Sequence, residues 1–342
     1  MKLLVLQTGS FSSVMLSTPL VRCVKMQVPE VEIHFLVREK HLPLVEHNVY
    51  IDHKYAAERV SLRQLKEVSF DHIIDLADND FTKKLARALR QRPHSYRKAG
   101  FQTAIYTKLK WNVMPRKHLA DRFFETVSFL NVQNDGRGLD YSVPKDHEVT
   151  ERDIPASHHL GYVAIAVGAS HFTKRMPVEK LQELCKMIDH PIMLIGAERE
   201  YADAEAIASF DPIKVYNACG KFYLHETADL IKRSKLLIAH DNGLAQLAAA
   251  LQKPVISVWG STTPSFGRRP YYDTHYLKLH ESVQEDVQLE KLWCRPCTAT
   301  GRDRCPLGHF KCMKEISVAS LAKIVHAKLN ELGKSKMVGL RN

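Results

Sequence analysis

The fold is decided by the stretch Ile238-Ala-His-Asp-Asn-Gly-Leu-Ala-Gln-Leu-Ala-Ala-Ala-Leu251 and by Pro254-Val-Ile-Ser-Val-Trp-Gly-Ser-Thr262 shortly after it. These residues predict a buried strand that ends in Asp-Asn-Gly, an Ala-rich helix, and a second strand that ends in Gly-Ser-Thr. Two parallel strands bridged by a helix direct the strand carboxyl ends and the helix amino end toward one crevice. Free N–H groups and the positive end of the helix dipole suit a phosphate there. An ordinary strand–helix–strand unit with a glycine in a tight turn explains the same residues, so both interpretations stay open.

Apolar runs and helical stretches alternate along the rest of the chain. In the first half, strands are expected near residues 2–8, 32–38, 49–52 and 71–77, and helices near 13–27, 61–68, 80–91 and 118–131. In the second half, strands are expected near 161–167, 191–196, 213–218, 235–240, 254–259 and 275–279, and helices near 177–188, 199–209, 224–233 and 243–251. Continuously apolar strands suit sheets that are covered on both faces. The alternation predicts an α/β protein with parallel sheets and right-handed crossovers.

A chain of 342 residues is too long for a typical single core, so we expect two domains. Residues 133–160 are polar and interrupted by two glycines and two prolines, which predicts a linker. The expected division is a Rossmann-like N-terminal domain over residues 1–150 and a Rossmann-like C-terminal domain over 156–315. A helix over 316–332 is expected at the junction of the two domains, followed by a disordered tail over 333–342.

The composition is that of a globular protein with an acidic partner. Apolar residues make up 45% of the chain, charged residues make up 25%, and the formal net charge is +11. Such a charge suits nucleic acid, an anionic membrane or phosphorylated lipid, or a nucleotide-sugar. No nucleic-acid-binding module is legible, so we expect no nucleic-acid partner. No apolar run approaches the roughly 18 residues of a membrane span. Residues 1–7 fit a first strand and not a signal peptide, so a cytoplasmic location is expected.

Further blocks, in order along the chain, agree with a known enzyme family. They are Ser17-Thr-Pro-Leu-Val-Arg22, Val167-Gly-Ala-Ser-His-Phe-Thr-Lys-Arg175, Ala218-Cys-Gly-Lys-Phe222 and Cys294-Arg-Pro-Cys297 with the cysteines after it. Together with the Asp-Asn-Gly turn, they resemble the lipopolysaccharide heptosyltransferases of glycosyltransferase family 9. The resemblance covers most of the chain and rests on several ordered motifs.

The resemblance implies the GT-B architecture, in which two Rossmann-like domains face each other across a cleft. It implies that the N-terminal domain binds an acceptor and the C-terminal domain binds a nucleotide-sugar. The implied reaction moves a sugar from an ADP-type donor to the lipopolysaccharide core with inversion, without a cofactor and without a metal ion at the reaction centre. The implied acceptor is an anionic glycolipid at the inner membrane, where the protein would be peripheral. Basic residues within 83–98 are a candidate surface for it, with a solvated helix face as the alternative.

Several residues are assigned to donor binding by the resemblance. Lys174, preceded by Thr173, matches the family's phosphate loop, where an ammonium group stabilises the charge of a departing diphosphate. Phe222 matches an apolar side chain that lies against the adenine, with a core phenylalanine as the alternative. Glu198 follows a strand, where a carboxylate can hold ribose hydroxyls, and Glu200 is a second candidate. Either glutamate can instead be favoured by the dipole of a helix start.

The turn after the predicted strand near residues 235–240 matches the family signature Asp-Ser/Thr-Gly-x-x-His at two positions and departs from it at two others. Asp241 is expected to accept hydrogen bonds from sugar hydroxyls, and Gly243 to let the backbone approach a phosphate. Asn242 stands in place of Ser or Thr, and Gln246 in place of His. Gln246 is still able to hydrogen-bond a sugar, but it carries neither a proton nor a charge. These departures therefore leave open a donor other than ADP-heptose.

A further departure falls on the expected general base. Inverting transfer needs a group that takes the proton of the acceptor hydroxyl, and in the family an Asp of the first loop does so. Alignment on Ser-Thr-Pro puts Ser13 at that position, and a lone hydroxyl is too weak a base. A substitute carboxylate is one account, with Asp78 and Asp80 as candidates unless they only cap a helix. The other accounts are a slow enzyme and a non-catalytic relative that binds the nucleotide-sugar or the glycolipid. A nucleotide-sugar epimerase, which would share the cleft between two Rossmann-like domains, is a further candidate function.

Four of the seven cysteines lie close together near the end of the chain. Their spacing is C-x2-C-x7-C-x6-C, formed by Cys294, Cys297, Cys305 and Cys312. Such spacing permits a tetrahedral structural metal site, with His309 as an alternative ligand. The family carries a similar cluster, which implies a structural staple of this loop. A zinc site and a set of free or disulfide-prone thiols are both open.

Overall fold

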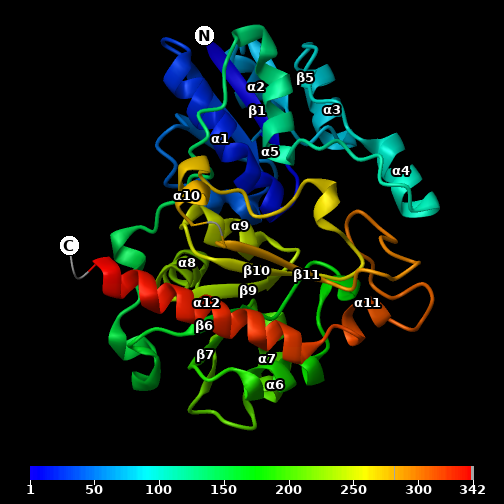
Figure 1. Cartoon of the computed structure of the whole chain (residues 1–342). Coiled ribbons are helices and arrows are strands. Elements are labelled where there is room, and N and C mark those ends of the chain that lie inside the picture. The colour runs from blue at the N-terminus through cyan, green and yellow to red at the C-terminus, as the bar shows by residue number, and fades with distance from the viewer. Residues whose placement is uncertain (281, 340–342) are drawn as a thin grey trace.

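The computed structural model describes residues 1–280 and 282–339 of the chain. It contains two parallel sheets, one formed by the N-terminal half and one by the C-terminal half (Figure 1). The N-terminal sheet has five strands in the order β3-β2-β1-β4-β5. These strands are β1 (Lys2–Gln7), β2 (Glu32–Val37), β3 (His53–Ala56), β4 (His72–Asp75) and β5 (His94–Ser95).

Helices and short 3-10 segments connect the strands of the N-terminal half. The helices are α1 (Phe11–Gln27), α2 (Leu62–Val68), α3 (Asp80–Ala88), α4 (Gly100–Leu109) and α5 (Leu119–Phe123). The 3-10 segments are η1 (Glu39–Leu44) and η2 (Phe124–Leu130), and η3 (Lys145–His147), η4 (Glu151–Asp153) and η5 (Ala156–His158) follow in the connection to the second half.

The C-terminal sheet has six strands in the order β11-β10-β9-β6-β7-β8. They are β6 (Val163–Ala166), β7 (Ile192–Ile195), β8 (Val215–Asn217), β9 (Leu236–His240), β10 (Val255–Trp259) and β11 (Gln284–Gln288). The helices are α6 (Val178–Met187), α7 (Tyr201–Ala208), α8 (Leu224–Arg233), α9 (Gly243–Ala250), α10 (Thr274–Leu279), α11 (Lys311–Lys314) and α12 (Val318–Gly339), and the 3-10 segments are η6 (Phe172–Lys174), η7 (Glu198–Glu200) and η8 (Pro264–Phe266). The prediction of an α/β protein with parallel sheets is confirmed.

The two halves share an apolar core where α1 and α9 pack against each other. α1 buries every residue from Val14 to Val24, because it contacts β1 and β2 as well as α9. α9 consists mostly of Ala and Leu, and most of its side chains are buried too. Buried residues of both helices belong to one cluster that includes strands of both sheets. The segments that follow β1 and β9 are thereby brought together.

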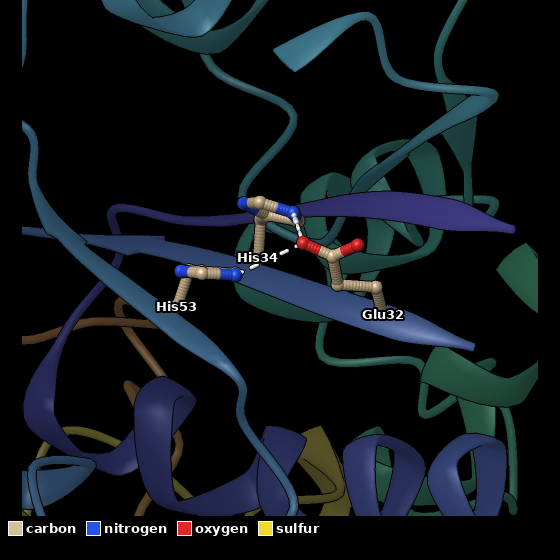
Figure 2. Close-up of side chains that lie close together, drawn as sticks. All are labelled: Glu32, His34 and His53. Atoms are coloured by element: carbon tan, nitrogen blue, oxygen red, sulfur yellow. Dashed lines mark hydrogen bonds and ion pairs between the residues drawn. The ribbon is translucent and has the colours of Figure 1, made fainter. Parts of the chain in front are cut away.

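A polar group lies at the start of β2 and β3, at the opposite end of the N-terminal sheet from the strand carboxyl ends (Figure 2). Oε1 of Glu32 lies 3.0 Å from Nε2 of His34 and 2.9 Å from Nε2 of His53. Nδ1 of His34 pairs with the Tyr55 hydroxyl at 2.9 Å. The carboxylate of Glu32 thus pairs with both imidazoles.

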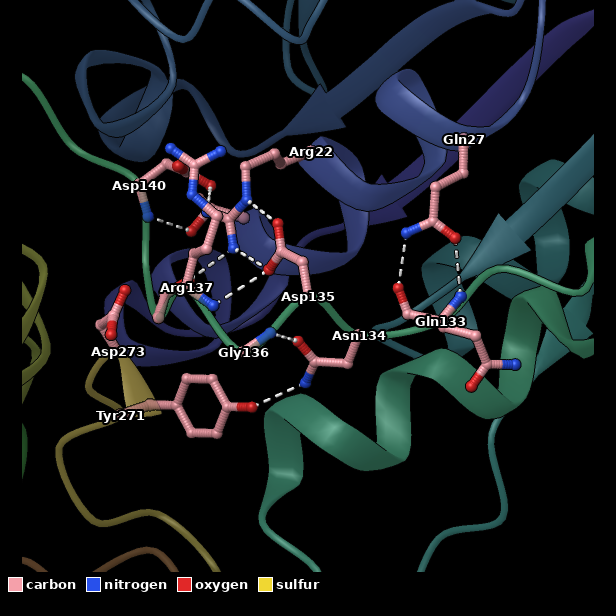
Figure 3. Close-up of polar contacts among 12 residues, drawn as sticks. Arg22, Gln27, Gln133, Asn134, Asp135, Gly136, Arg137, Asp140, Tyr271 and Asp273 are labelled. Atoms are coloured by element: carbon pink, nitrogen blue, oxygen red, sulfur yellow. Dashed lines mark hydrogen bonds and ion pairs between the residues drawn. The ribbon is translucent and has the colours of Figure 1, made fainter. Parts of the chain in front are cut away.

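The expected linker is fixed to both halves (Figure 3). Arg22 of α1 is 1% exposed, and its guanidinium donates to the two carboxylate oxygens of Asp135 at 2.8 and 2.9 Å. It also forms an ion pair with Asp140. The side-chain amide of Asn134 lies 2.7 Å from the hydroxyl of Tyr271 in the C-terminal half. Residues 134–140, at the start of the connection, are therefore bonded to α1 on one side and to the C-terminal half on the other.

Two predicted strands are placed differently by the structure. Residues 275–279 form α10, because the Asp273 carboxylate caps a helix by accepting from the N–H groups of His275 at 2.7 Å and Tyr276 at 3.0 Å. The edge strand is instead β11, whose sequence Gln-Glu-Asp-Val-Gln is too polar to show an apolar run. β3 lies at residues 53–56 and not at 49–52.

The last helix is longer than predicted and lies elsewhere. α12 continues to Gly339, so the segment expected to be disordered is helical up to that residue, and residues 340–342 lie outside the described residues. Its buried side chains belong to the core of the C-terminal sheet, and it contacts α6 (Figure 1). The prediction of a helix over 316–332 at the junction is therefore corrected, since α12 covers the C-terminal sheet. In the described part of the chain, no helix is both long and apolar enough to span a membrane.

Candidate functional site

A buried ion pair joins the ends of two neighbouring strands of the C-terminal sheet. Lys174 lies in η6, which follows β6, and Asp241 directly follows β9, which pairs with β6. Nζ of Lys174 is 3.0 Å from Oδ2 of Asp241, and the two side chains are only 7% and 9% exposed. The structure thus brings together two residues that the sequence assigns to donor binding, beside the amino end of α9.

Asn242 caps α9 and ties it to the loop after β6. Its Oδ1 accepts from the N–H of Ala245 at 3.2 Å, which satisfies one of the free donors of the helix start. Its amide Nδ2 donates to the carbonyl of Gly168 at 2.8 Å. Asn242, which stands in place of the family's Ser or Thr, therefore still caps α9 and also bonds to the loop that leads to Lys174.

Gly243 is covered by an aromatic ring from the other half of the molecule. A Cβ atom at this position would overlap the ring of Phe11, the first residue of α1. The glycine is thus required for the close approach of α1 to α9. The expected approach of a phosphate to the Gly243 backbone would need Phe11 to move aside.

Gln246 differs from its expected role. The side chain is 2% exposed, and its Nε2 donates to the carbonyls of Arg268 at 3.0 Å and Arg269 at 2.9 Å. Its Oε1 accepts from the N–H of Tyr271 at 3.2 Å. Because its amide is already committed to the backbone, Gln246 positions the segment 268–271 instead of offering a bond to a sugar.

Thr173 is also committed to internal contacts. Its hydroxyl accepts from the N–H of Arg302 at 2.8 Å and from Oγ of Ser261 at 2.9 Å. Gly301, with a φ of +104°, lies so close that a Cβ there would meet Cδ of Lys174 at 2.8 Å. The loop that carries the late cysteines therefore packs over the Lys174 stem, and Thr173 anchors it.

The residues expected to hold the nucleoside lie next to one another. Gly220, with a φ of +72°, places the turn before Phe222 against Glu198, since a Cβ on Gly220 would lie 2.8 Å from Cα of Glu198. Glu198 is exposed, and Phe222 is half-buried against the core. Glu200 is instead buried, accepts from Arg199 at 2.6 Å, and lies 3.7 Å from Arg175. Of the two glutamates, Glu198 is the one that faces solvent.

Ser13 lies in the first turn of α1, close to the contact between Phe11 and Gly243. Its Oγ is 3.1 Å from Oγ of Ser10, the residue that caps α1. A pair of hydroxyls supplies no basic group. His41 also lies beside this loop, with its ring centre 6.4 Å from that of Phe11. Burial lowers the pKa of His41 to about 4, so its imidazole is neutral near pH 7.

Asp78 is held by two lysines. Its carboxylate lies 2.9 Å from Nζ of Lys83 and 3.3 Å from Nζ of Lys98. Burial alone would raise the pKa of Asp78, but the hydrogen bond from Lys83 and the charge of Lys98 outweigh it and lower the pKa. Asn79, and not Asp78 or Asp80, caps α3. A carboxylate with a lowered pKa is a weaker base, so Asp78 is less suited to take a proton than its sequence position indicated.

The late cysteines are free thiols that lie near one another. Sγ of Cys294 is 3.8 Å from Nε2 of His309. Burial raises the pKa of Cys297 and of Cys312, and the neighbouring thiols Cys294 and Cys305 raise both further. Within the described residues, no three of these sulfur atoms come within 4.8 Å of each other. The zinc site stays a prediction, and the packing on Lys174 is consistent with a structural staple.

Sequence reasoning missed the residues that reach the site from other segments. Phe11 and His41 come from the N-terminal half, and Arg302 comes from the cysteine loop. None of them belongs to a motif with a fixed spacing to Lys174 or Asp241. Only the positions of complete elements in space bring them together.

Comparison with known proteins settles the family. The model of glycosyltransferase family 9 (heptosyltransferase) matches residues 59–294, which is more than half of the chain. The chain belongs to this family. It is 25% identical over 319 residues to lipopolysaccharide heptosyltransferase 1 of Campylobacter coli, a match that covers 85% of this chain and 92% of that protein. Against lipopolysaccharide heptosyltransferase 1 of Escherichia coli K12, identity is 21% over 295 residues, 77% of this chain and 89% of the relative.

Solved structures of the family share the fold. A family 9 glycosyltransferase from Veillonella parvula superposes with a TM-score of 0.73 at 20% identity and covers 96% of this chain and 97% of that one. The Escherichia coli ADP-heptose lipopolysaccharide heptosyltransferase II gives a TM-score of 0.72 at 17% identity over 97% and 99% of the two chains. These matches confirm the GT-B fold that the resemblance implied.

Proposed function

We propose that this family 9 glycosyltransferase transfers heptose from ADP-heptose to the lipopolysaccharide core with inversion. The proposal is supported by the relatives, one of which was solved with ADP, and by the ion pair between Lys174 and Asp241 at the amino end of α9. In such a transfer the acceptor oxygen forms a bond to the anomeric carbon of heptose while the bond from that carbon to the diphosphate breaks. ADP leaves, and the proton of the acceptor hydroxyl goes to a base.

The observation that carries the proposal is the buried Lys174–Asp241 pair. Negative charge grows on the leaving diphosphate, and a positioned ammonium group stabilises it more in the transition state than in the ground state. The amino end of α9 contributes the positive end of its dipole to the same place. Asp241, which holds Lys174 on one side, is positioned to accept from a sugar hydroxyl. Glu198, after β7, and Phe222, in the segment after β8, complete the site on the nucleoside side, since Gly220 packs the turn before Phe222 against Glu198.

Neither candidate for the group that takes the proton, Ser13 or Asp78, is a good base. Ser13 has a hydroxyl partner, and the Asp78 carboxylate is held by two lysines. We therefore expect transfer by the unmodified chain to be slow or absent. A chain that binds the donor or the glycolipid without turnover is the second candidate function, and Ser13 is the observation that favours it.

A transfer assay with ADP-heptose and heptose-free lipopolysaccharide core distinguishes the two. Ser13→Asp should raise the rate by about a hundredfold to ten-thousandfold, the usual contribution of a general base. Ser12→Asp, which adds the same charge one residue away, is the matched control and should give no gain. Lys174→Ala should abolish the gain. Rapid transfer by the unmodified chain would support the transferase and show that a group other than Ser13 takes the proton, and no gain from Ser13→Asp would favour the binding protein.

The acceptor is proposed to meet the N-terminal half, residues 1–150, while residues 156–315 bind the donor. In α4, every side chain is at least partly exposed, and Figure 1 shows this helix at the edge of the molecule. Phe101 is 77% exposed and Trp111 is 69% exposed. Exposed lysines and arginines of residues 83–98 precede them in the chain. Apolar side chains near a basic cluster suit an anionic glycolipid at the cytoplasmic face of the inner membrane.

Vesicle binding tests this surface. A chain with Phe101→Ser and Trp111→Ser should sediment less with vesicles that contain anionic lipid, and high salt should weaken binding of the parent. Ile213→Ser, an equally exposed apolar position in the C-terminal half, is the matched control. Unchanged binding of the double variant would place the acceptor surface elsewhere.

A further inference from the structure

A group of metal-ligating side chains bridges the two halves of the molecule, separate from the donor residues. Glu46 and His47 follow η1 in the N-terminal half, and His225 lies in the first turn of α8 in the C-terminal half. One ligand atom from each of the three residues lies within 4.8 Å of the others. Glu46 and His47 are exposed, whereas His225 is only 6% exposed. The buried imidazole of His225 therefore lies close to two exposed side chains that are able to bind a metal.

One nitrogen of His225 has a partner and the other has none. Its Nδ1 lies 2.7 Å from the hydroxyl of Tyr141. Its Nε2 is buried and has no hydrogen-bond partner among the described residues. Oε2 of Glu46 is 4.0 Å from Nε2, too far for a hydrogen bond. A buried polar atom without a partner costs stability, and in a native protein it often marks an absent ion or water.

The contact with Tyr141 orients the imidazole for ligation. The Tyr141 hydroxyl has lone pairs, so it is able to accept a hydrogen bond from Nδ1–H of His225. With the proton on Nδ1, the lone pair is on Nε2, the atom that lies 4.0 Å from Oε2 of Glu46. Histidines that bind metals are commonly fixed in this way by a hydrogen bond at the other nitrogen.

We propose that Glu46, His47 and His225 bind a divalent transition-metal ion such as Zn²⁺, which joins the two halves. Zinc takes imidazole nitrogen and carboxylate oxygen at about 2.0–2.2 Å, with three protein ligands and an open position in many sites. Rotation of the two exposed side chains closes the present spacing. A cavity of about 230 Å³, bordered by His47, His225, Asp140 and Tyr141, lies beside the group and leaves room for water as a further ligand.

Two other groups in the chain could take up the same ion, so the test has to separate them. The group of Glu32, His34 and His53 meets the same distance criterion, but Nε2 of His34 and Nε2 of His53 already pair with the Glu32 carboxylate (Figure 2). The cysteine cluster would bind through thiolates. Co²⁺ distinguishes these cases, because thiolate ligands add an intense charge-transfer absorption that nitrogen and oxygen ligands lack.

The experiment is a Co²⁺ titration of the full chain after treatment with a chelator. The parent should bind one equivalent of Co²⁺ more than either His225→Gln or His47→Gln. If a variant still binds that equivalent, its affinity for Co²⁺ should be at least tenfold lower than that of the parent. The lost equivalent should show ligand-field absorption without a thiolate band. His34→Gln, the control in the other group, should bind as the parent does. Zn²⁺ should raise the unfolding temperature of the parent more than that of His47→Gln.

The proposal is overturned if His225→Gln and His47→Gln keep every equivalent at unchanged affinity. It is also overturned if the lost equivalent carries a thiolate band, or if only His34→Gln loses an ion. Because His47 is exposed, its variant keeps the test informative even where His225→Gln fails to fold. The readout does not depend on transfer activity, so it stands apart from the proposed function.

Discussion

Gly243 is restricted to glycine by a side chain from the other half of the molecule. A Cβ atom at this position would overlap the Phe11 ring. Replacing Gly by Ala within a helix ordinarily stabilises by up to about 1 kcal/mol. Overpacking of a close contact costs about 1–3 kcal/mol, so Gly243→Ala should destabilise the protein instead of stabilising it. We predict that Gly243→Ala lowers the free energy of unfolding more in the parent than in a chain that carries Phe11→Ala, where only the 2.8 Å contact with Cβ of residue 11 remains.

Denaturant unfolding of the four chains of this double-mutant cycle measures the coupling. An equal effect of Gly243→Ala with and without Phe11 would show that the ring does not constrain this position. The same four chains also report on the donor site. If Phe11 has to move for a phosphate to approach, Phe11→Ala should bind ADP at least as tightly as the parent.

His240, the last residue of β9, makes stability depend on pH. Burial lowers its pKa to about 4, and its Nε2 accepts from the N–H of Met176 at 2.9 Å. In the unfolded chain a histidine has a pKa of about 6.5, so below that pH the unfolded state binds the proton first. The unfolding free energy should therefore fall as pH drops from about 6.5 to about 4, by up to about 3 kcal/mol for this residue.

Comparison with His240→Gln isolates this contribution, because other groups also titrate in that range. The variant should lose less stability than the parent between pH 6.5 and pH 4, and His275→Gln, at an exposed position, should behave as the parent does. Parallel pH profiles for His240→Gln and the parent would contradict the assignment. The measurement is chemical unfolding at a series of pH values.

The residues of the candidate site were predictable to different degrees. The sequence placed Lys174 and Asp241 at one edge of the sheet, because residues that follow neighbouring parallel strands lie close together, but it did not predict their ion pair. The role of Gln246 could not be predicted, because its partners are backbone carbonyls of Arg268 and Arg269. Backbone groups are the same in every residue, so no sequence pattern marks them.

At the scale of elements, α9 depends on its cap. Asn242 accepts from the N–H of Ala245 and donates to the carbonyl of Gly168. Asn242→Ser, which restores a family residue, keeps a cap but loses the second bond, and should cost about 1 kcal/mol. Asn242→Ala loses both, and should cost about 2 kcal/mol. Unfolding experiments that give the same value for the two variants would show that the bond to Gly168 contributes nothing.

Elements with strong apolar patterns were predicted well, and polar edges were not. The central strands β6 and β9 are buried at every residue, and both follow the predicted runs. β11 is half-exposed and polar, so its sequence carries no comparable signal. The opposite error arose in α10, because a strand was predicted over residues 275–279 although the Asp273 cap favours a helix. Capping contacts decide such short elements, and they become visible only with the structure.

At the scale of the whole molecule, Arg22 holds the connection between the halves. Its carboxylate partners Asp135 and Asp140 come from the predicted linker, and their side chains are 25% and 22% exposed. The sequence identified this segment as a linker from its glycines and prolines, but not its contact with α1. Long-range pairs of charged residues have no periodicity from which they could be read.

Removing this guanidinium should destabilise the protein. Arg22→Met would leave two partly buried carboxylates unpaired, which should cost about 3 kcal/mol, near the lower end for broken buried ion pairs because water reaches both. Arg63→Met is the matched control, since Arg63 is 90% exposed and pairs with Glu67 on a helix surface. That control should cost about 0–1 kcal/mol. Equal losses of unfolding free energy in Arg22→Met and Arg63→Met would show that the contacts of Arg22 with the connecting segment do not stabilise the protein.

The measurement that tests the central claim most directly is a calorimetric titration of ADP into the parent, Lys174→Ala and Lys323→Ala. A charge-assisted hydrogen bond contributes about 1.5–3 kcal/mol, so Lys174→Ala should weaken ADP binding by about tenfold to a hundredfold. Lys323→Ala, an exposed position on α12, should bind ADP as the parent does. ADP binding by Lys174→Ala that equals the parent's would show that the donor site does not lie at the Lys174–Asp241 pair.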